Sequence, residues 1–351
     1  MRKIFYRIPI LNKIVAQRDA LLKKVADLES EKMTILEEDN GNDFRDIFLS
    51  PWTDEWKKFN TENHDRVVNL LENLKSGMDE DSKDVVDILW EKIIYLIPHN
   101  RYKRSFLYKI NDFFTEEELK DQKKSIDLTK YKFPSGINIE EPIFSTKNGL
   151  VFLSENIIKK IKNRAIIDGG GYIGDSALAF CDYAPSKIYS FEPVDFLYNK
   201  LSETIALNGV SEIIEPVKLG LSDSEKEVKI FGIDSGASLH TSSKDNFQNI
   251  KTTTVDKFVS EKNIDVGLIK LDVEGSELEV IRGSLETINK YTPVLLISVY
   301  HRPEDFFFIK PLLEDLNLGY KFMMRKTSPF RITSETVLIG YVNKWKQWKK
   351  T

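Results

Sequence analysis

Short apolar runs alternate with longer amphipathic segments from residue 165 to the end of the chain. Runs of this length are typical of buried strands, and the segments between them follow the helical period. Their alternation predicts a parallel sheet wrapped by helices on both faces, an α/β doubly wound fold. The expected strands are 165–167, 187–191, 213–219, 266–271, 293–300, 320–324 and 336–342, and the expected helices are 174–182, 195–207, 276–289 and 304–315.

Two hairpins are expected beside this alternation. Residues 137–144 and 150–153 have the pattern of short strands, and Asn148-Gly149 between them is a strong hairpin turn signal. This hairpin would lead into the sheet and could cover a site as a flap. A second, polar hairpin-like insert is expected from strands at 226–231 and 252–255.

The N-terminal part of the chain has a different pattern. Residues 1–34 contain a heptad-like apolar series, which predicts a helix of about three heptads that could pair with a copy of itself or with a partner. Its basic, aromatic start could instead rest on an anionic membrane surface, and a helix packed on its own domain is the third alternative. Residues 44–130 have a helical pattern and predict an accessory domain. The core of that domain would include Trp52, Trp56 and Trp90.

Composition and charge narrow the class of protein. The chain has 351 residues and a net charge of −4, so it lacks the overall positive charge that is typical of a nucleic-acid-binding protein. Its single cysteine, Cys181, excludes an intramolecular disulfide and fits a reducing cytoplasm. No apolar run approaches membrane-spanning length, and Arg7 interrupts the only apolar N-terminal stretch. We expect a cytoplasmic protein. The basic, aromatic tail 344–351 could contact the inner face of a membrane or a glycolipid, and a frayed, solvated tail is the alternative.

Candidate chemistry gathers where the first core strand ends. Asp168 is followed by Gly169, Gly171 and Gly174, which have the spacing of a nucleotide-binding turn. Glycines let the chain turn sharply and let a ligand approach the backbone amides. The next helix points its N-terminus at the same place. A turn that uses glycine only for packing is the alternative.

A carboxylate at Asp168 favours one kind of ligand. Dinucleotide enzymes usually keep this position apolar, because a pyrophosphate lies close by. A carboxylate suits a ligand with a cationic part and hydroxyls, such as S-adenosylmethionine. Glu192 lies 18 residues beyond Gly174, at the end of the next strand, where an acid can accept hydrogen bonds from both ribose hydroxyls.

Two more strand ends carry reactive side chains. Asp272 and Glu274 follow the strand 266–271, and residues two apart can both face a cleft if the chain stays extended; a helix cap is the alternative for Glu274. His301 follows the strand 293–300, and its unperturbed pKa makes it the first candidate for a general base. A histidine bonded to backbone is the alternative. Asp272, Glu274 and His301 could also bind a divalent metal, although we assign no metal ligand.

Five segments, in this order, resemble the FkbM family of S-adenosylmethionine (SAM)-dependent methyltransferases over residues 137–343. They are IIDGGGYIGDSA, YSFEPV, GLSD, TTTVDKF and LIKLDVEGSELEVIRG. The resemblance implies a class I, Rossmann-like methyltransferase fold, whose seven-stranded and mostly parallel sheet has one antiparallel strand near the edge. It implies SAM as cofactor and methylation of a hydroxyl. The chain departs from the family pattern at Gly170, where alanine is usual, and at Ser298, where many members have glutamate.

By position, the resemblance also implies roles for individual residues. Glu192 would bind the ribose, Ser222-Asp223 would lie where the adenine is held, and Asp272 and Glu274 would lie beside the methionine moiety. The SAM turn would comprise Asp168, Gly169, Gly171, Tyr172, Gly174, Asp175 and Ser176.

These observations lead to one expected function. It is a SAM-dependent O-methyltransferase that acts by in-line displacement on a sugar hydroxyl of a cell-surface polysaccharide or glycolipid. A non-carbohydrate hydroxyl and a catalytically degenerate scaffold in a glycan biosynthesis complex are the alternatives. An NAD-dependent oxidoreductase is disfavoured by Asp168 and by the acidic block at 272–274.

Overall fold

The computed structural model describes residues 52–96, 128–137, 139, 141–231, 247–328 and 335–343. The heptad series at 1–34 and the tail at 344–351 lie outside these residues, as does the whole segment 97–127. Among the residues described, no helix combines the length and the apolar character needed to cross a membrane.

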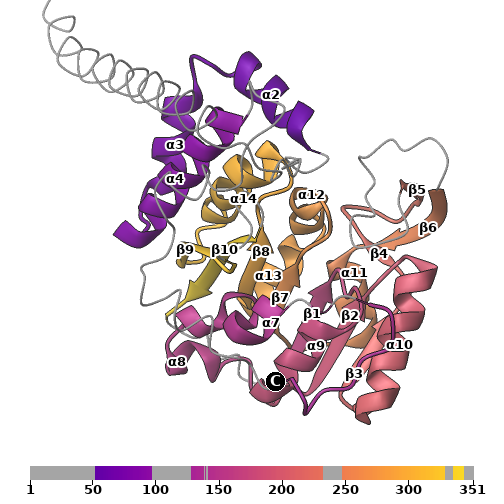
Figure 1. Cartoon of the computed structure of the whole chain (residues 1–351). Helices are drawn as coiled ribbons and strands as arrows, with labels where there is room; N and C mark the ends of the chain where they lie inside the picture. The colour runs from indigo at the N-terminus through magenta and orange to yellow at the C-terminus, as the bar shows by residue number, and fades with distance from the viewer. Residues whose placement is uncertain are drawn as a thin grey trace, which may run out of the picture.

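A seven-stranded sheet forms the centre of the molecule (Figure 1). Numbered along the chain, the sheet strands lie in the order 3-2-1-4-5-7-6. The seventh strand along the chain runs antiparallel to both of its neighbours in the sheet. The mostly parallel sheet and its antiparallel strand are therefore confirmed. From one edge to the other, the strands are β3 (Ile214–Val217), β2 (Lys187–Phe191), β1 (Ala165–Gly169), β7 (Val266–Leu271), β8 (Val294–Ser298), β10 (Thr336–Val342) and β9 (Tyr320–Lys326).

Helices cover the sheet, and two expected elements have different bounds. The expected helix 276–289 is broken into α12 and α13 around Gly283, where a Cβ would lie 2.3 Å from the Ser222 carbonyl oxygen. A close backbone approach thus accounts for the break. The expected strand 213–219 ends at Val217. The helices are α9 (Asp175–Phe180), α10 (Asp195–Asn208), α11 (Val255–Lys262), α12 (Glu277–Arg282), α13 (Leu285–Tyr291) and α14 (Pro303–Asp315), and η2 (Cys181–Tyr183) is a 3-10 turn.

The polar insert forms a small sheet of its own. Its strands are β4 (Gly220–Leu221), β5 (Glu227–Phe231) and β6 (Phe247–Thr253), in the order β4-β6-β5. The antiparallel β5–β6 pair confirms the hairpin-like insert, but the second strand begins earlier than expected.

The expected hairpin at 137–153 is wrong. This segment forms α7 (Glu141–Thr146) and the helical turn η1 (Lys147–Phe152), followed by α8 (Glu155–Ile158). Asn148 and Gly149 do take positive φ, 53° and 103°, as a hairpin turn would require. However, the flanking apolar residues Ile143, Phe144 and Leu150 pack into one core cluster instead of alternating between two faces. Tertiary packing therefore overrides the local turn signal.

The N-terminal helices α2 (Thr53–Glu62), α3 (Val67–Lys75) and α4 (Glu80–Leu96) pack beside α14 and β9 (Figure 1). Trp52, Trp56 and Trp90 are buried, and their core cluster continues into residues of the sheet and of α14. The backbone N–H of Met324 on the edge strand β9 donates to Ser82 Oγ at 2.9 Å. The helices therefore cover a sheet edge that would otherwise be open to pairing.

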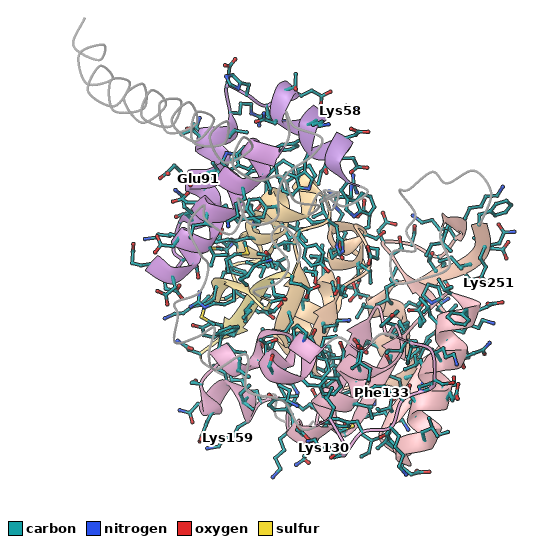
Figure 2. All side chains as sticks on the ribbon, in the orientation of Figure 1. Lys58, Glu91, Lys130, Phe133, Lys159 and Lys251 are labelled. Atoms are coloured by element: carbon teal, nitrogen blue, oxygen red, sulfur yellow. The ribbon has the colours of Figure 1, made fainter. Side chains whose placement is uncertain are left out.

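Long charged side chains lie around the outside of this core (Figure 2). Lys58, Lys130, Lys159 and Lys251 are all exposed and come from four separate parts of the chain. The candidate site is built instead from buried and half-buried charged groups at the carboxyl ends of the strands.

Candidate functional site

A single cleft opens where β1, β2, β7 and β8 end, at the edge of the sheet where ligands bind in open α/β folds. One end of the cleft is mainly apolar apart from a carboxylate, and the other end is acidic. Its lining includes Gly170, Tyr172, Asp175, Ser176, Glu192, Leu219, Leu221, Ile230, Ile250, Lys270, Asp272, Glu274 and Tyr300.

The glycine turn is held tightly against neighbouring strands. Gly170 has a φ of +76°, and a Cβ there would lie 1.8 Å from the Asp272 carbonyl oxygen. A Cβ at Gly171 would lie 2.3 Å from Ser190 Oγ, and Gly174 has a φ of +90°. Packing therefore requires these glycines, as the alternative interpretation held. The case for a ligand rests on the cleft lining, to which Gly170, Tyr172, Asp175 and Ser176 contribute.

Asp168 lies beneath the turn and does not line the cleft. It is fully buried, with Oδ2 accepting from Ser190 Oγ at 2.6 Å and Oδ1 lying 3.2 Å from Lys270 Nζ. The direct ligand contact expected of Asp168 is therefore not supported, because both of its oxygens already face protein partners. Asp168 and Gly169 support the turn from below.

Lys270 is a site residue that the sequence reasoning missed. Its ammonium donates to the carbonyl oxygens of Gly170 at 2.7 Å and Gly169 at 3.2 Å, while pairing with Asp168. Burial opposes the charge, but the carboxylates of Asp168 and Asp272 outweigh it and raise the pKa of Lys270. The signal in the sequence was a single lysine within the apolar strand VGLIKL.

Glu192 is fixed with its carboxylate at the cleft wall. Its Oε2 accepts from the backbone N–H of Tyr172 at 3.0 Å and its Oε1 accepts from that of Val194 at 2.9 Å. Burial raises the pKa of Glu192 to about 7, although these two N–H groups favour the anion. A carboxylate oxygen has more than one acceptor position, so Glu192 can still bind two ligand hydroxyls.

Asp175 and Ser176 follow the turn at the start of α9. Asp175 Oδ1 accepts from the backbone N–H of Ser176 at 2.8 Å, and burial raises the pKa of Asp175 to about 6. Ser176 Oγ accepts from Asn148 Nδ2 at 3.2 Å. The misjudged segment 141–152 therefore does reach the site, as a helical support for the turn.

Ser222 and Asp223 are not in the cleft. Ser222 is buried under Gly283, while Asp223 is exposed and pairs with Ser224 and Lys226. The cleft lining therefore does not support their expected place beside an adenine. The apolar wall of the cleft comes instead from β4, β5, β6 and the residue before β4, through Leu219, Leu221, Ile230 and Ile250.

The acidic end brings Asp272, Glu274 and His301 together, as the sequence predicted. His301 Nε2 lies 3.4 Å from Glu274 Oε2 and 3.7 Å from Asp272 Oδ1, and Asp272 Oδ1 also accepts from the Tyr300 hydroxyl at 3.2 Å. The imidazole is only 2% exposed.

The positive charge on the His301 ring argues against the expected role of this residue as a general base. Burial disfavours the imidazolium, but Glu277, Glu274 and Asp272 outweigh burial and raise the pKa of His301 to about 10. In the absence of another cation the ring is therefore protonated at neutral pH. A protonated imidazole has no lone pair with which to accept a proton.

Glu277 is a second residue that the sequence reasoning missed. It is fully buried, and its Oε1 lies 3.0 Å from His301 Nδ1. The same carboxylate accepts from the backbone N–H groups of Val273 at 2.8 Å and Gly275 at 3.0 Å. It therefore fixes both the histidine ring and the loop that carries Glu274, whose φ is +54°.

The N-terminal helices complete the acidic end. Trp56 Nε1 donates to the His301 carbonyl oxygen at 2.9 Å. The Trp52 ring meets the His301 ring edge-on at 6.2 Å and covers Gly275. Glu55 pairs with Arg302 at 3.0 Å. No local pattern in the sequence could indicate these contacts, because the partners are more than 200 residues apart.

The sheet order and the cleft at its carboxyl edge are those of a class I methyltransferase fold. Residues 168–322 match the family model described as the methyltransferase FkbM domain. Over these residues the chain is similar to that family.

Solved structures give the same fold. Methyltransferase FkbM from Methylobacillus flagellatus KT is 17% identical, with a TM-score of 0.54 over 82% of this chain and 61% of that one. The chain thus spans about three fifths of that protein, and at this identity the match establishes the fold alone. M. jannaschii TYW2 in complex with AdoMet is more distant, at 14% identity and a TM-score of 0.31, over 60% of this chain and 80% of that one. A search of the curated proteins found no match.

S-adenosylmethionine is the cofactor that such a domain implies, and the cleft residues fit it. Glu192 offers a fixed carboxylate for ribose hydroxyls, and the wall around Leu219 and Ile230 suits a flat base. The carboxylate of Asp272 suits the cationic methionine part.

Proposed function

We propose that the protein is a SAM-dependent O-methyltransferase that acts on a sugar hydroxyl of a cell-surface polysaccharide or glycolipid. One observation carries this proposal: a single cleft joins the ribose-type carboxylate Glu192 to a group of hydrogen-bonding oxygens on Asp272, Glu274 and Tyr300. The first end suits the cofactor. The second offers several acceptors and a hydroxyl, which is what a polyhydroxylated acceptor needs.

When bound, S-adenosylmethionine supplies an electrophilic methyl group that an acceptor oxygen displaces in line. The chain contributes mainly position, because holding two reactants in line removes much of the entropic barrier. Glu192 would fix the ribose, and the acidic end would orient the hydroxyl. The carboxylates of Asp272 and Glu274 are about one quarter exposed, so either can receive the proton that the hydroxyl loses.

Oxygen as the nucleophile and a glycan as the acceptor are supported by the family resemblance. A non-carbohydrate hydroxyl is the nearest alternative. A degenerate scaffold is less well supported, because the turn, Glu192 and the acidic cluster are all assembled around one cleft. Pairing through residues 1–34 and contact of the tail 344–351 with a membrane stay predictions, since both segments lie outside the described residues.

The first test is calorimetric titration with SAM and S-adenosylhomocysteine. We expect the wild-type chain to bind both, and Glu192→Ala to weaken binding by about tenfold or more, because a charged hydrogen-bond acceptor is lost. Asp223→Asn is the matched control, since it removes an exposed carboxylate outside the cleft. Equal affinities in wild type and Glu192→Ala would contradict the site, and no binding by the wild type would favour the scaffold.

The acceptor class needs a second experiment. Methyl-labelled SAM is incubated with panels of oligosaccharides, other alcohols and amines, and carbon-13 spectra separate O-methyl from N-methyl products. We expect O-methyl sugars. A product formed only from amines would overturn O-methylation while leaving the cofactor assignment intact.

A further inference from the structure

Three carboxylates surround one imidazole at the acidic end of the cleft. Asp272 and Glu274 approach Nε2 from the cleft side, and Glu277 lies 3.0 Å from Nδ1 on the buried side. Even a protonated ring leaves this group with a net negative charge. The neighbouring basic side chains are engaged in other pairs: Lys270 with Asp168, and Arg302 with Glu55, Glu279 and Glu304.

One ring nitrogen of His301 is buried without a hydrogen-bond partner. The side chain is 2% exposed, and Nε2 has no hydrogen-bond partner among the described residues, whereas Nδ1 lies 3.0 Å from Glu277 Oε1. Buried polar groups are normally bonded, and an exception calls for an explanation such as an ion. The Nε2 atom faces the two half-buried carboxylates that line the cleft, so the ring is aimed at a place that a ligand can reach.

From this geometry we infer that His301 Nε2, Asp272 and Glu274 form a binding site for a divalent transition-metal ion, with the remaining coordination positions open to the cleft. Ligand atoms on a tetrahedral zinc ion lie about 3.3–3.6 Å apart, given bond lengths of about 2.0–2.2 Å. The distances from Nε2 to the two carboxylate oxygens, 3.4 and 3.7 Å, are close to this range. One imidazole and two carboxylates suit zinc, cobalt or manganese.

Glu277 has a different role from the three ligands. Its carboxylate and the ligand atoms of Asp272 and His301 lie within 4.8 Å of one another, but Glu277 is on the Nδ1 side of the ring, and both of its oxygens accept backbone N–H groups. A carboxylate that receives the Nδ1 proton holds the ring so that Nε2 can bind a metal. Glu277 is thus a positioning residue for the site.

An ion here would lie at the acceptor end of the cleft. A hydroxyl bound to a divalent ion loses its proton more readily, so the ion would activate the acceptor hydroxyl. That role rests on the proposed function, whereas ion binding itself does not.

The test uses Co²⁺, added alone to the full-length, metal-stripped protein. We expect one Co²⁺ per chain, with visible absorption bands of four or five coordination. We also expect one hyperfine-shifted, exchangeable proton signal in the NMR spectrum, from Nδ1–H held by Glu277. That signal identifies an imidazole bound through Nε2 and needs no variant. Absence of saturable binding, or binding without the imidazole signal, would overturn the proposal.

Variants sharpen the result. Glu274→Gln and His301→Gln should weaken Co²⁺ binding by at least about tenfold, and Glu277→Gln by about 10–100-fold with loss of the exchangeable signal. Asp223→Asn should leave binding unchanged. Undiminished binding in Glu274→Gln and His301→Gln would place the ion elsewhere and reject the site. SAM titration of the same samples separates this outcome from a failure of the cofactor assignment.

Discussion

The two ends of the cleft are built in different ways. At the cofactor end, main-chain groups hold the charged side chains. The backbone N–H groups of Tyr172 and Val194 donate to Glu192, and the carbonyl oxygens of Gly169 and Gly170 accept from Lys270. At the acidic end, side chains from three separate segments meet. Residues 272–277 and His301 supply the charges, and α2 covers them with Trp52 and Trp56.

This difference teaches which part of the site can tolerate change. A main-chain site depends on the path of the backbone, so it fails when a side chain is added where none fits. A side-chain site depends on rotamers held by distant partners, and it changes by degrees when one partner is altered. The following predictions test that contrast, from the largest expected effect to the smallest.

Gly170→Ala should cause the largest loss. Alanine is usual here in the family, but in this chain a Cβ at this position would lie 1.8 Å from the Asp272 carbonyl oxygen, and the φ of +76° is itself unfavourable for alanine. The backbone has to move, so we expect SAM binding to be abolished and the free energy of unfolding to fall by roughly 2–4 kcal/mol. Calorimetric titration and denaturant unfolding measure the two effects.

Gly209→Ala is the matched control. Gly209 also has a positive φ, +64°, but a Cβ there would meet nothing within 4 Å. We expect a loss of about 1–2 kcal/mol from backbone strain alone and unchanged SAM binding. If the two variants behaved alike, conformational strain would account for both, and the tight contact between the turn and Asp272 would have no special importance.

The same contrast explains what the sequence could predict. The mostly parallel sheet with one antiparallel strand followed from alternating patterns and the family resemblance, and the turn followed from glycine spacing. These are local signals, and β1, the strand that leads into the turn, is buried throughout. The segment 137–153 failed because Asn148-Gly149 is equally compatible with a hairpin and with a turn between two helical segments.

Side-chain roles were harder to predict, for a physical reason. The pattern placed Asp272, Glu274 and His301 at one edge, and they do meet. The sequence pattern could not show that Lys270 and Ser190 each face one carboxylate oxygen of Asp168, because burial depends on packing between strands. Nor could it show that Glu277, Glu274 and Asp272 raise the pKa of His301 to about 10, which argues against the expected general base.

The affinity for SAM should depend on pH through Glu192. Because its pKa in the folded protein is about 7, the free protein holds a proton on this carboxyl below that pH. Ribose hydroxyls need the anion, so binding must release the proton, and affinity should fall about tenfold from pH 8 to pH 6. Titration in buffers of different ionisation enthalpy measures the proton release directly.

The stability of the ligand-free protein should follow the opposite trend. The pKa of Glu192 is raised from an ordinary 4.5, so the folded state binds this proton more tightly than the unfolded state does. This contribution to stability is present at low pH and is lost as the pH rises from about 4.5 to 7. Glu192→Gln cannot titrate and should remove both trends. A pH dependence that persists in that variant would point to Asp175, whose pKa is raised to about 6.

Trp56→Phe should have the smallest effect, confined to the acidic end. The change removes the hydrogen bond to the His301 carbonyl oxygen, worth about 0.5–1.5 kcal/mol, but keeps an aromatic ring in the core. We expect methyl transfer to the acceptor found in the screen to slow several-fold, with SAM affinity unchanged. Trp90→Phe is the control, because its ring lies in the same core against Trp56 and Phe307. If both variants slowed transfer equally, α2 would act only by stabilising the fold; a loss specific to Trp56→Phe would make the N-terminal helices part of the acceptor site.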